Sequence, residues 1–197
     1  MVKVHLLTLG AYQTNCYIFH EENAKTCCVV DPGYEPEVIE EKLQELGLTL
    51  EAILLTHGHF DHVGGVRQLA ADTQCEVYLC ADDLSMPPQL TAGQLFYTKS
   101  YGDGSLLHLA GLDIAVLATP GHTPGSVCLL VEDVLFSGDT LFAGSCGRTD
   151  LPGGSWDDIR ASLGRLSRLE ANLWVLPGHG GSTTLLEEKK HNPYMRN

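Results

Sequence analysis

Residues 56–62 read THGHFDH, and this stretch sets the expectations for the whole chain. It holds four candidate metal ligands: His57, His59, Asp61 and His62. Imidazole and carboxylate groups are ligands of Zn²⁺, Fe²⁺ and Mn²⁺, and such a density of them has few structural uses. Gly58 lets the backbone fold tightly between the first two histidines, whereas the last two candidates point to a neighbouring position. The segment therefore predicts ligands for two metal ions.

Three further loops carry ligand-type residues, and each loop follows a short apolar run. The residues are His122 in TPGHTPGS, Asp139 in FSGDT and His179 in PGHG. Loops at the carboxyl ends of strands in α/β sheets lie along the same rim, so they can meet although the first and last histidines are more than a hundred residues apart. Two metal ions about 3.5–4 Å apart need a bridging carboxylate, and Asp139 is the natural candidate. The pattern predicts a binuclear metal centre.

Composition limits the class of protein. The chain has 197 residues, of which 44% are apolar and 19% charged, so it can bury one substantial core, and we expect one domain over residues 1–197. The formal net charge of −13 has the wrong sign for binding the phosphates of nucleic acid. The seven cysteines form no CxxC pair, and no run of about 18 apolar residues is present. We therefore expect a soluble, cytoplasmic protein with reduced thiols and no membrane partner.

Short apolar runs bounded by turn residues predict strands, among them residues 2–9, 16–19 and 27–30. The clearest helix covers residues 36–46, where Ile39, Leu43 and Leu46 share one face and Gly47 ends the pattern. Further helices are expected over residues 61–69, 156–169 and 184–190. Strands and helices are mixed throughout, which is typical of an α/β fold.

In this order, the four motifs resemble those of the metallo-β-lactamase superfamily of binuclear metallohydrolases. The resemblance implies a four-layer αββα sandwich with the site along one edge of the paired sheets. It implies that one metal is bound by His57, His59 and His122, and the other by Asp61, His62 and His179, with Asp139 as the bridge. Asp31, which ends a strand before Pro32, resembles a buried aspartate of the family that organises the site and is not a ligand.

Within the superfamily, the chain is similar to short glyoxalase II-like enzymes. The stretches that carry this similarity are GSCGRTDLPGGS (144–155) and PGHGGSTTLLEEKKHNPY (177–194). Typical glyoxalase II enzymes add a C-terminal helical domain whose basic side chains hold the carboxylates of glutathione, and we expect this protein, whose sequence runs to Asn197, to lack that domain. Arg148 matches the position of a basic residue that approaches glutathione in the family. It is therefore the expected substrate-binding residue.

The expected reaction is hydrolysis of a hydroxyacyl thioester such as S-lactoylglutathione. Two cations that share a water lower its pKa toward neutrality and polarise the substrate carbonyl, so a metal-bridging hydroxide is the expected nucleophile. Asp61 is the candidate catalytic residue, because it can orient this hydroxide or take its proton. A thiolate leaves as a stable anion and needs little help from a general acid. We expect two zinc ions, with iron or manganese as alternatives, and a small-molecule thioester as the binding partner.

Other functions fit parts of the same pattern. A mononuclear iron dioxygenase that oxidises persulfides is one alternative, because CGRTD (146–150) also resembles that branch of the superfamily, although the retained His179 argues against it. A lactonase shares the ligand set, whereas a non-catalytic metal-binding module would usually have lost some ligands. β-Lactam hydrolysis is less expected, since those enzymes generally lack a bridging aspartate. The histidines outside the motif loops are expected to have no ligand role: His5, His20, His108 and His191.

Overall fold

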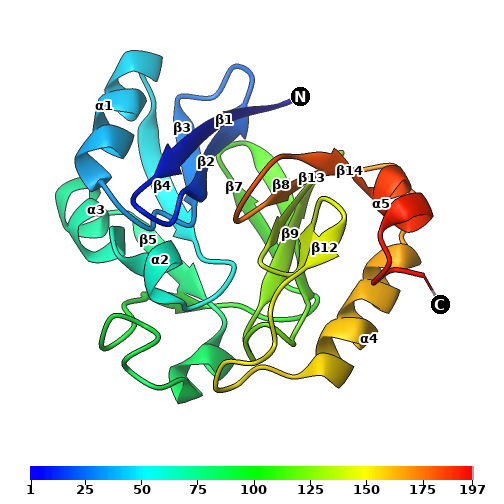
Figure 1. The fold of residues 1–197 in the computed structure, drawn as a ribbon. Coiled ribbons are helices and arrows are strands. Elements are labelled where there is room, and N and C mark those ends of the chain that lie inside the picture. The colour runs from blue at the N-terminus through cyan, green and yellow to red at the C-terminus, as the bar shows by residue number, and fades with distance from the viewer. Residues whose placement is uncertain (197) are drawn as a thin grey trace.

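The structure is a computed structural model that describes residues 1–196. Two six-stranded sheets pack face to face, and helices cover the outer side of each sheet (Figure 1). This is the four-layer αββα sandwich, of the α/β class, that the family resemblance implies. In the described part of the chain, no helix has the length and apolar character needed to cross a membrane.

The first sheet contains strands β1 to β6 in chain order. Their bounds are β1 (Val2–Leu9), β2 (Thr14–Glu21), β3 (Thr26–Val30), β4 (Thr49–Leu54), β5 (Glu76–Leu79) and β6 (Lys99–Ser100). Strands β3 to β6 run parallel, and helices α1 (Pro36–Leu46) and α3 (Val66–Thr73) lie in the connections between them. Both helices pack on the outer face of the sheet, where Ile18, Val29 and Ile53 form part of a buried apolar cluster.

The second sheet has the strand order β14-β13-β10-β9-β8-β7. The bounds are β7 (Leu106–Leu109), β8 (Leu112–Ala118), β9 (Val127–Val131), β10 (Val134–Gly138), β13 (Trp174–Pro177) and β14 (Thr183–Thr184). Helices α4 (Trp156–Ser167) and α5 (Leu185–His191) cover its outer face (Figure 1). The remaining elements are α2 (Phe60–Val63), the 3₁₀ helix η1 (Ala81–Ser85) and the small hairpin of β11 (Leu141–Phe142) and β12 (Ser145–Cys146).

Strand β2 shows how the layers are joined. Its alternate residues Tyr17 and Phe19 belong to the core between the two sheets, whereas Cys16 and Ile18 belong to the core under the helices. The strand is therefore buried on both faces, which explains the unbroken apolar run over residues 16–19 at its centre. The ring of Phe19 lies 5.0 Å from that of Phe136 on β10, centroid to centroid. This contact joins the two sheets directly.

Helix α1 begins and ends where the sequence predicts. Pro36 stands in its first turn, where the missing N–H is not needed. At the other end Gly47 has a φ of 65°, and its N–H contacts the carbonyl oxygens of Leu43 and Gln44. Ile39 and Leu43 face the sheet and are buried. Local signals fix this element at both ends.

The single helix predicted over residues 61–69 is wrong, because the structure has two helices there, α2 and α3, separated by Gly64 and Gly65. The loop that follows β3 packs against this break. A Cβ atom at Gly64 would overlap the carbonyl oxygen of Gly33, and the N–H of Gly65 donates to the carbonyl oxygen of Pro32 at 2.9 Å. A tertiary contact thus interrupts a helix that local spacing favours.

The strands that precede the motif loops all end at one edge of the sandwich. Strands β3 and β4 are parallel, as are β10 and β13. Strands β8 and β10 both pair antiparallel with β9, so they also run in the same direction. The loops after these strands therefore meet, as the sequence predicts.

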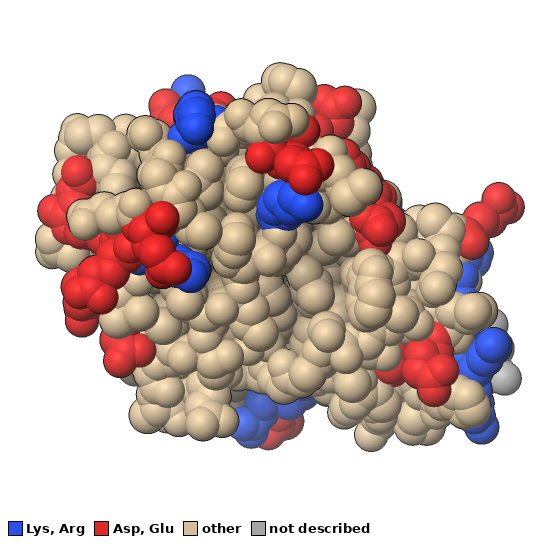
Figure 2. Space-filling view, turned by 90° about the horizontal axis from the view of Figure 1, so that it is seen from above, with Lys and Arg blue, Asp and Glu red and all other residues tan. Residues whose placement is uncertain are grey.

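Figure 2 shows the molecule from above the view of Figure 1. Charged side chains form separate groups on this face around a broad uncharged area, and acidic groups are more frequent than basic ones. This agrees with the excess of 25 acidic over 12 basic residues in the chain. The face offers no continuous basic surface.

We expect Gly33→Ala to destabilise the protein by about 1–3 kcal/mol, because the new Cβ would overlap the carbonyl oxygen of Asp61 and push two site loops apart. Urea unfolding measures the change. Gly102→Ala is the matched control, since a Cβ there meets nothing within 4 Å, and its effect should stay below about 1 kcal/mol. Equal losses in the two variants would show that the loops do not depend on this close packing.

Candidate metal centre

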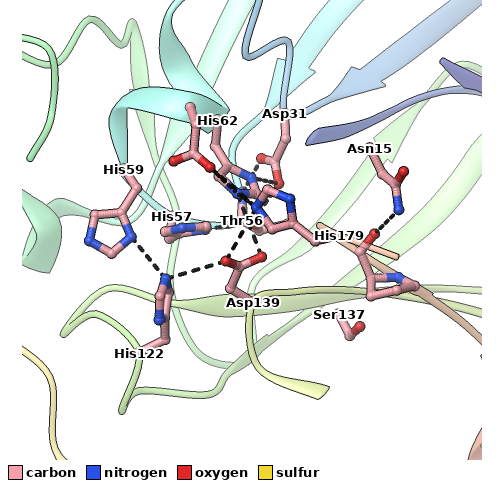
Figure 3. A network of polar contacts seen from close by, with 12 residues as sticks. Asn15, Asp31, Thr56, His57, His59, His62, His122, Ser137, Asp139 and His179 are labelled. Atoms are coloured by element: carbon pink, nitrogen blue, oxygen red, sulfur yellow. Dashed lines mark hydrogen bonds and ion pairs between the residues drawn. The ribbon is translucent and has the colours of Figure 1, made fainter. Parts of the chain in front are cut away.

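All seven candidate ligands converge at the edge between the two sheets (Figure 3). Within one group, formed by His57, His59 and His122, the potential ligand atoms lie within 4.8 Å of one another. The same limit holds for a second group, formed by Asp61, His62 and His179.

Asp139 lies between these two groups. Its Oδ2 atom is 3.4 Å from Nε2 of His122 in the first group and 3.6 Å from Nε2 of His179 in the second. Its Oδ1 atom is 3.5 Å from Nε2 of His62. One carboxylate therefore reaches both groups, which is the position that a bridging ligand needs.

Unpaired polar atoms show that the cluster fits metal ions. The Nε2 atoms of His57 and His59 and the Oδ1 atom of Asp139 are buried and have no hydrogen-bond partner among residues 1–196. A buried polar atom left unpaired costs about 1–3 kcal/mol, so Nε2 of His57 and Oδ1 of Asp139 call for a ligand. His59 faces the cluster with its other nitrogen, Nδ1, which lies 2.8 Å from Nε2 of His122. Imidazole nitrogens and carboxylate oxygens are the donors that zinc, iron and manganese accept. The residues therefore fit a pair of divalent cations.

Nearby acceptors orient two of the candidate ligands. Nδ1 of His62 lies 2.9 Å from Oδ2 of Asp31, and Nδ1 of His122 lies 2.8 Å from the carbonyl oxygen of Arg148. Because each acceptor takes the Nδ1 proton, Nε2 of each ring is left to bind a metal. Asp31 also accepts hydrogen bonds from the backbone N–H and the hydroxyl of Thr56, at 2.8 and 2.6 Å. Both of its oxygens are thus occupied, in keeping with an organising role.

The electrostatics of the cluster favour cations. Burial, together with the charges of neighbouring imidazoles, lowers the pKa of His59 to about 4 and the pKa of His57 well below its usual value, so both rings are neutral at pH 7. Burial also lowers the pKa of His62, but the negative charges of Asp139, Asp31 and Asp61 outweigh it and raise this pKa to about 9. The field that holds a proton on His62 is the field that attracts a metal ion.

The structure adds Asp83, which sequence reasoning missed. This fully buried carboxylate accepts the N–H of Gly58 at 2.7 Å, the N–H of Gly125 at 2.6 Å and the hydroxyl of Thr123 at 3.1 Å. It therefore joins the loop that carries His57 and His59 to the loop that carries His122. No local signal reveals it, because Asp83 stands in a short 3₁₀ helix beside the exposed Asp82.

Asn15 holds the loop of His179 from the opposite sheet. Its side-chain amide donates to the carbonyl oxygens of Pro177 at 2.9 Å and Gly180 at 2.8 Å (Figure 3). The hydroxyl of Tyr17 donates to the same Pro177 oxygen at 2.7 Å. Residues of β2 thus fix the position of a candidate ligand that follows β13.

A cavity of about 460 Å³ opens beside the candidate ligands. Its other lining residues are largely apolar: Tyr12, Phe60, Leu90, Phe142, Ser145, Cys146, Arg148 and Leu151. The predicted substrate-binding residue Arg148 is there, but its guanidinium donates two hydrogen bonds of 2.7 Å to the carboxylate of Asp150. Burial raises the pKa of Cys146, which is half-buried, so its thiol stays protonated. Cys146 therefore lines the cavity as an uncharged side chain and is not a reactive thiolate.

Comparisons with known proteins agree with this geometry. A model of the metallo-β-lactamase superfamily matches residues 9–179. The hydroxyacylglutathione hydrolase GloC of Haemophilus influenzae is 32% identical and is aligned over 98% of each chain. The crystal structure of TTHA1623 in a di-iron-bound form is 38% identical, with a TM-score of 0.85 over 97% of this chain and 100% of that one. That of BLEG-1 B3 metallo-β-lactamase is 34% identical, with a TM-score of 0.89 and complete coverage of both chains.

We expect Asp83→Asn to destabilise the protein by about 1–3 kcal/mol, because an amide N–H₂ would face donors that now have a carboxylate acceptor. The variant should also lose metal to a chelator faster than the wild-type protein. Urea unfolding and metal release to a coloured chelator measure the two effects. Asp82→Asn, on the exposed neighbour, is the control. Identical behaviour of the two variants would contradict the role given to Asp83.

Proposed function

This chain belongs to the metallo-β-lactamase superfamily, and we propose that it is a binuclear metallohydrolase that cleaves thioesters of the hydroxyacyl-glutathione type. The observation that carries the proposal is the pair of candidate ligand groups, with Asp139 between them, beside a cavity. The name of the relative GloC, hydroxyacylglutathione hydrolase, supports the choice of substrate class.

The residues around the cavity favour a leaving group that needs no proton. Apart from the candidate ligands, the titratable residues of its lining are Tyr12, Cys146 and Arg148. None of them is a histidine or a carboxylic acid, the groups that most often serve as general acids. A thiolate leaves as a stable anion, whereas the alkoxide of a lactone would require protonation. The thioester therefore fits this lining better than the lactone.

In the proposed mechanism, His57, His59 and His122 would hold one cation, and Asp61, His62 and His179 would hold the other. Asp139, which lies between the two groups, would be their shared ligand. When bound, the two cations supply a water that ionises near neutral pH and positive charge beside the substrate carbonyl oxygen.

Asp61 is the proposed catalytic residue of the chain itself. Burial raises its pKa, but the hydrogen bond from His179 and the charge of His62 outweigh this effect and lower the pKa to about 2. Its carboxylate is therefore ionised at neutral pH, and it can orient the attacking water by accepting a hydrogen bond from it. Tyr12 and Phe60 pack edge to face, with ring centroids 5.1 Å apart, and form an apolar wall beside it.

The second ligand group argues for two metals. A mononuclear iron dioxygenase would require only a triad such as His57, His122 and Asp139. It would not require the second group, formed by Asp61, His62 and His179, as metal ligands. We propose zinc as the metal, with iron or manganese as alternatives, and the di-iron form of TTHA1623 shows that a 38% identical protein accepts two irons. The seven free cysteines are in keeping with a reducing compartment, and we propose the cytoplasm.

We expect the zinc-loaded protein to hydrolyse S-lactoylglutathione, and His57→Ala to reduce kcat/KM by more than about 100-fold, because it removes a metal ligand. Thiol release measures the rate. A panel of other thioesters, lactones and a β-lactam defines the substrate class. The β-lactam is included because BLEG-1 is named as a metallo-β-lactamase.

Two results would overturn this function. One is thioester turnover no faster than that of His57→Ala. The other is oxygen consumption with glutathione persulfide by the iron-loaded protein, in the absence of any hydrolysis.

We expect Arg148→Gln to raise KM for S-lactoylglutathione by about three- to tenfold with kcat nearly unchanged, because Arg148 lies at the cavity lining and is proposed to bind the thiol half of the substrate. Asp150→Asn should lower KM, since it frees the guanidinium from its present partner. Steady-state kinetics measure both. Arg160→Gln, on α4, is the control. Unchanged KM values in both variants would remove Arg148 from the binding site.

A further inference from the structure

Two histidines outside the metal centre, His5 on β1 and His20 on β2, face each other across the first two strands. Nε2 of His5 on β1 lies 3.4 Å from Nε2 of His20 on β2. The two rings are nearly coplanar, with an interplanar angle of 8° and centroids 5.6 Å apart. His5 pairs in register with Ile18, so His20 lies diagonally opposite on the same face of the sheet. The pair is on the outer face, near α1.

The distance of 3.4 Å between the two nitrogens is long for a hydrogen bond and matches that of two nitrogens bound to one ion. N–H groups usually lie 2.7–3.2 Å from an oxygen acceptor. Two nitrogens that are each about 2.0–2.1 Å from a tetrahedral zinc ion lie about 3.3–3.4 Å apart. In the metal centre, the facing nitrogens are 3.2 Å apart for His62 and His179 and 2.8 Å apart for His59 and His122. The spacing of His5 and His20 therefore resembles that of two ligands of one metal.

The other nitrogen of His20 fixes its tautomer. Nδ1 lies 2.7 Å from the backbone carbonyl oxygen of Glu21, which can only accept, so Nδ1 carries the proton. The lone pair of Nε2 then points toward His5. An Nδ1 proton donated to a carbonyl oxygen is typical of metal-bound histidine. His20 is only 9% exposed, so its ring is held in this orientation.

Carboxylates partly balance the positive charges near the pair. Lys3 pairs with Glu22 at 2.9 Å, and Lys42 pairs with Glu45 at 3.0 Å, so each neighbouring ammonium group has a carboxylate partner. Burial lowers the pKa of His5, followed by the charges of His20 and Lys42, whereas Glu45 raises it. The ring is therefore neutral at pH 7, as a metal ligand must be.

The remaining surface histidines differ from this pair. His108 faces Asp113 at 2.8 Å, and His191 faces Glu187 at 3.6 Å. Each of these is an exposed contact of imidazole with carboxylate, which needs no ion. His5 and His20 face each other, nitrogen to nitrogen.

We propose that His5 and His20 form a further metal site, which binds one divalent transition-metal ion of the kind that imidazole accepts, such as Zn²⁺, with water in the remaining positions. The ion would cross-link β1, an edge strand of the first sheet, to β2. Strand β2 also carries Asn15 and Tyr17, which hold the loop of His179. The site would therefore stabilise the N-terminal hairpin on which part of the metal centre rests. This differs from the expectation of no ligand role for these two residues.

The test counts zinc in protein whose metal centre is already loaded. After equilibrium dialysis against a series of free Zn²⁺ concentrations, the wild-type protein should bind one zinc per chain more than His5→Gln or His20→Gln. Its melting temperature should rise over the same concentration range, and those of the two variants should not. His108→Gln is the matched control and should behave as the wild type.

A second measurement needs no variant. Zinc should protect His5 of the wild-type protein from diethylpyrocarbonate, with mass spectrometry locating the modified histidines, and should leave the reactivity of His108 unchanged. The proposal is overturned if both variants retain the additional zinc, if the wild type binds none, or if His5 reacts equally with and without zinc. None of these readouts uses a substrate, so they stand apart from the thioesterase test.

Discussion

The packing of the two sheets against each other is the constraint on which the site depends. The first sheet supplies the loop of His57 and His59, and the second supplies the loops of His122, Asp139 and His179. Neither sheet alone brings together a complete ligand group. The core between them, in which Phe19 contacts Phe136, fixes the distance across the site. Leaving ligand atoms such as Nε2 of His57 buried and unpaired costs free energy. The burial of apolar side chains between the sheets offsets this cost.

Three buried polar side chains connect the packed sheets to the candidate ligands by hydrogen bonds. Asp31 joins the end of β3 to His62, Asp83 joins two ligand loops, and Asn15 joins the first sheet to the loop of His179. Each replaces water around a loop with fixed hydrogen bonds inside the protein. Such bonds are stronger where water is excluded, and they leave the metal-facing nitrogens in place. These hydrogen bonds therefore position the ligand loops independently of any bound ligand.

Features encoded by neighbouring residues were predictable from the sequence. Both ends of helix α1 are predictable because Pro36 favours the first turn of a helix and Gly47 favours the backbone conformation that ends one. The seven ligand candidates were found because the motifs are dense and follow strands, and their division into two groups came from the family resemblance. Features that depend on partners distant in the sequence were missed. The helix break at Gly64 arises from contact with another loop, and Asp83 gains its role only through folded neighbours. The facing of His5 and His20 likewise depends on the register of β1 and β2.

The central claim is that the two ligand groups hold two cations with Asp139 between them. The most direct test is an anomalous difference map from crystals of the zinc-loaded protein, recorded at the zinc absorption edge. The account predicts two peaks inside the cluster, about 3.5–4 Å apart and both within bonding distance of Asp139. A single peak there, or peaks only outside the cluster, would contradict it.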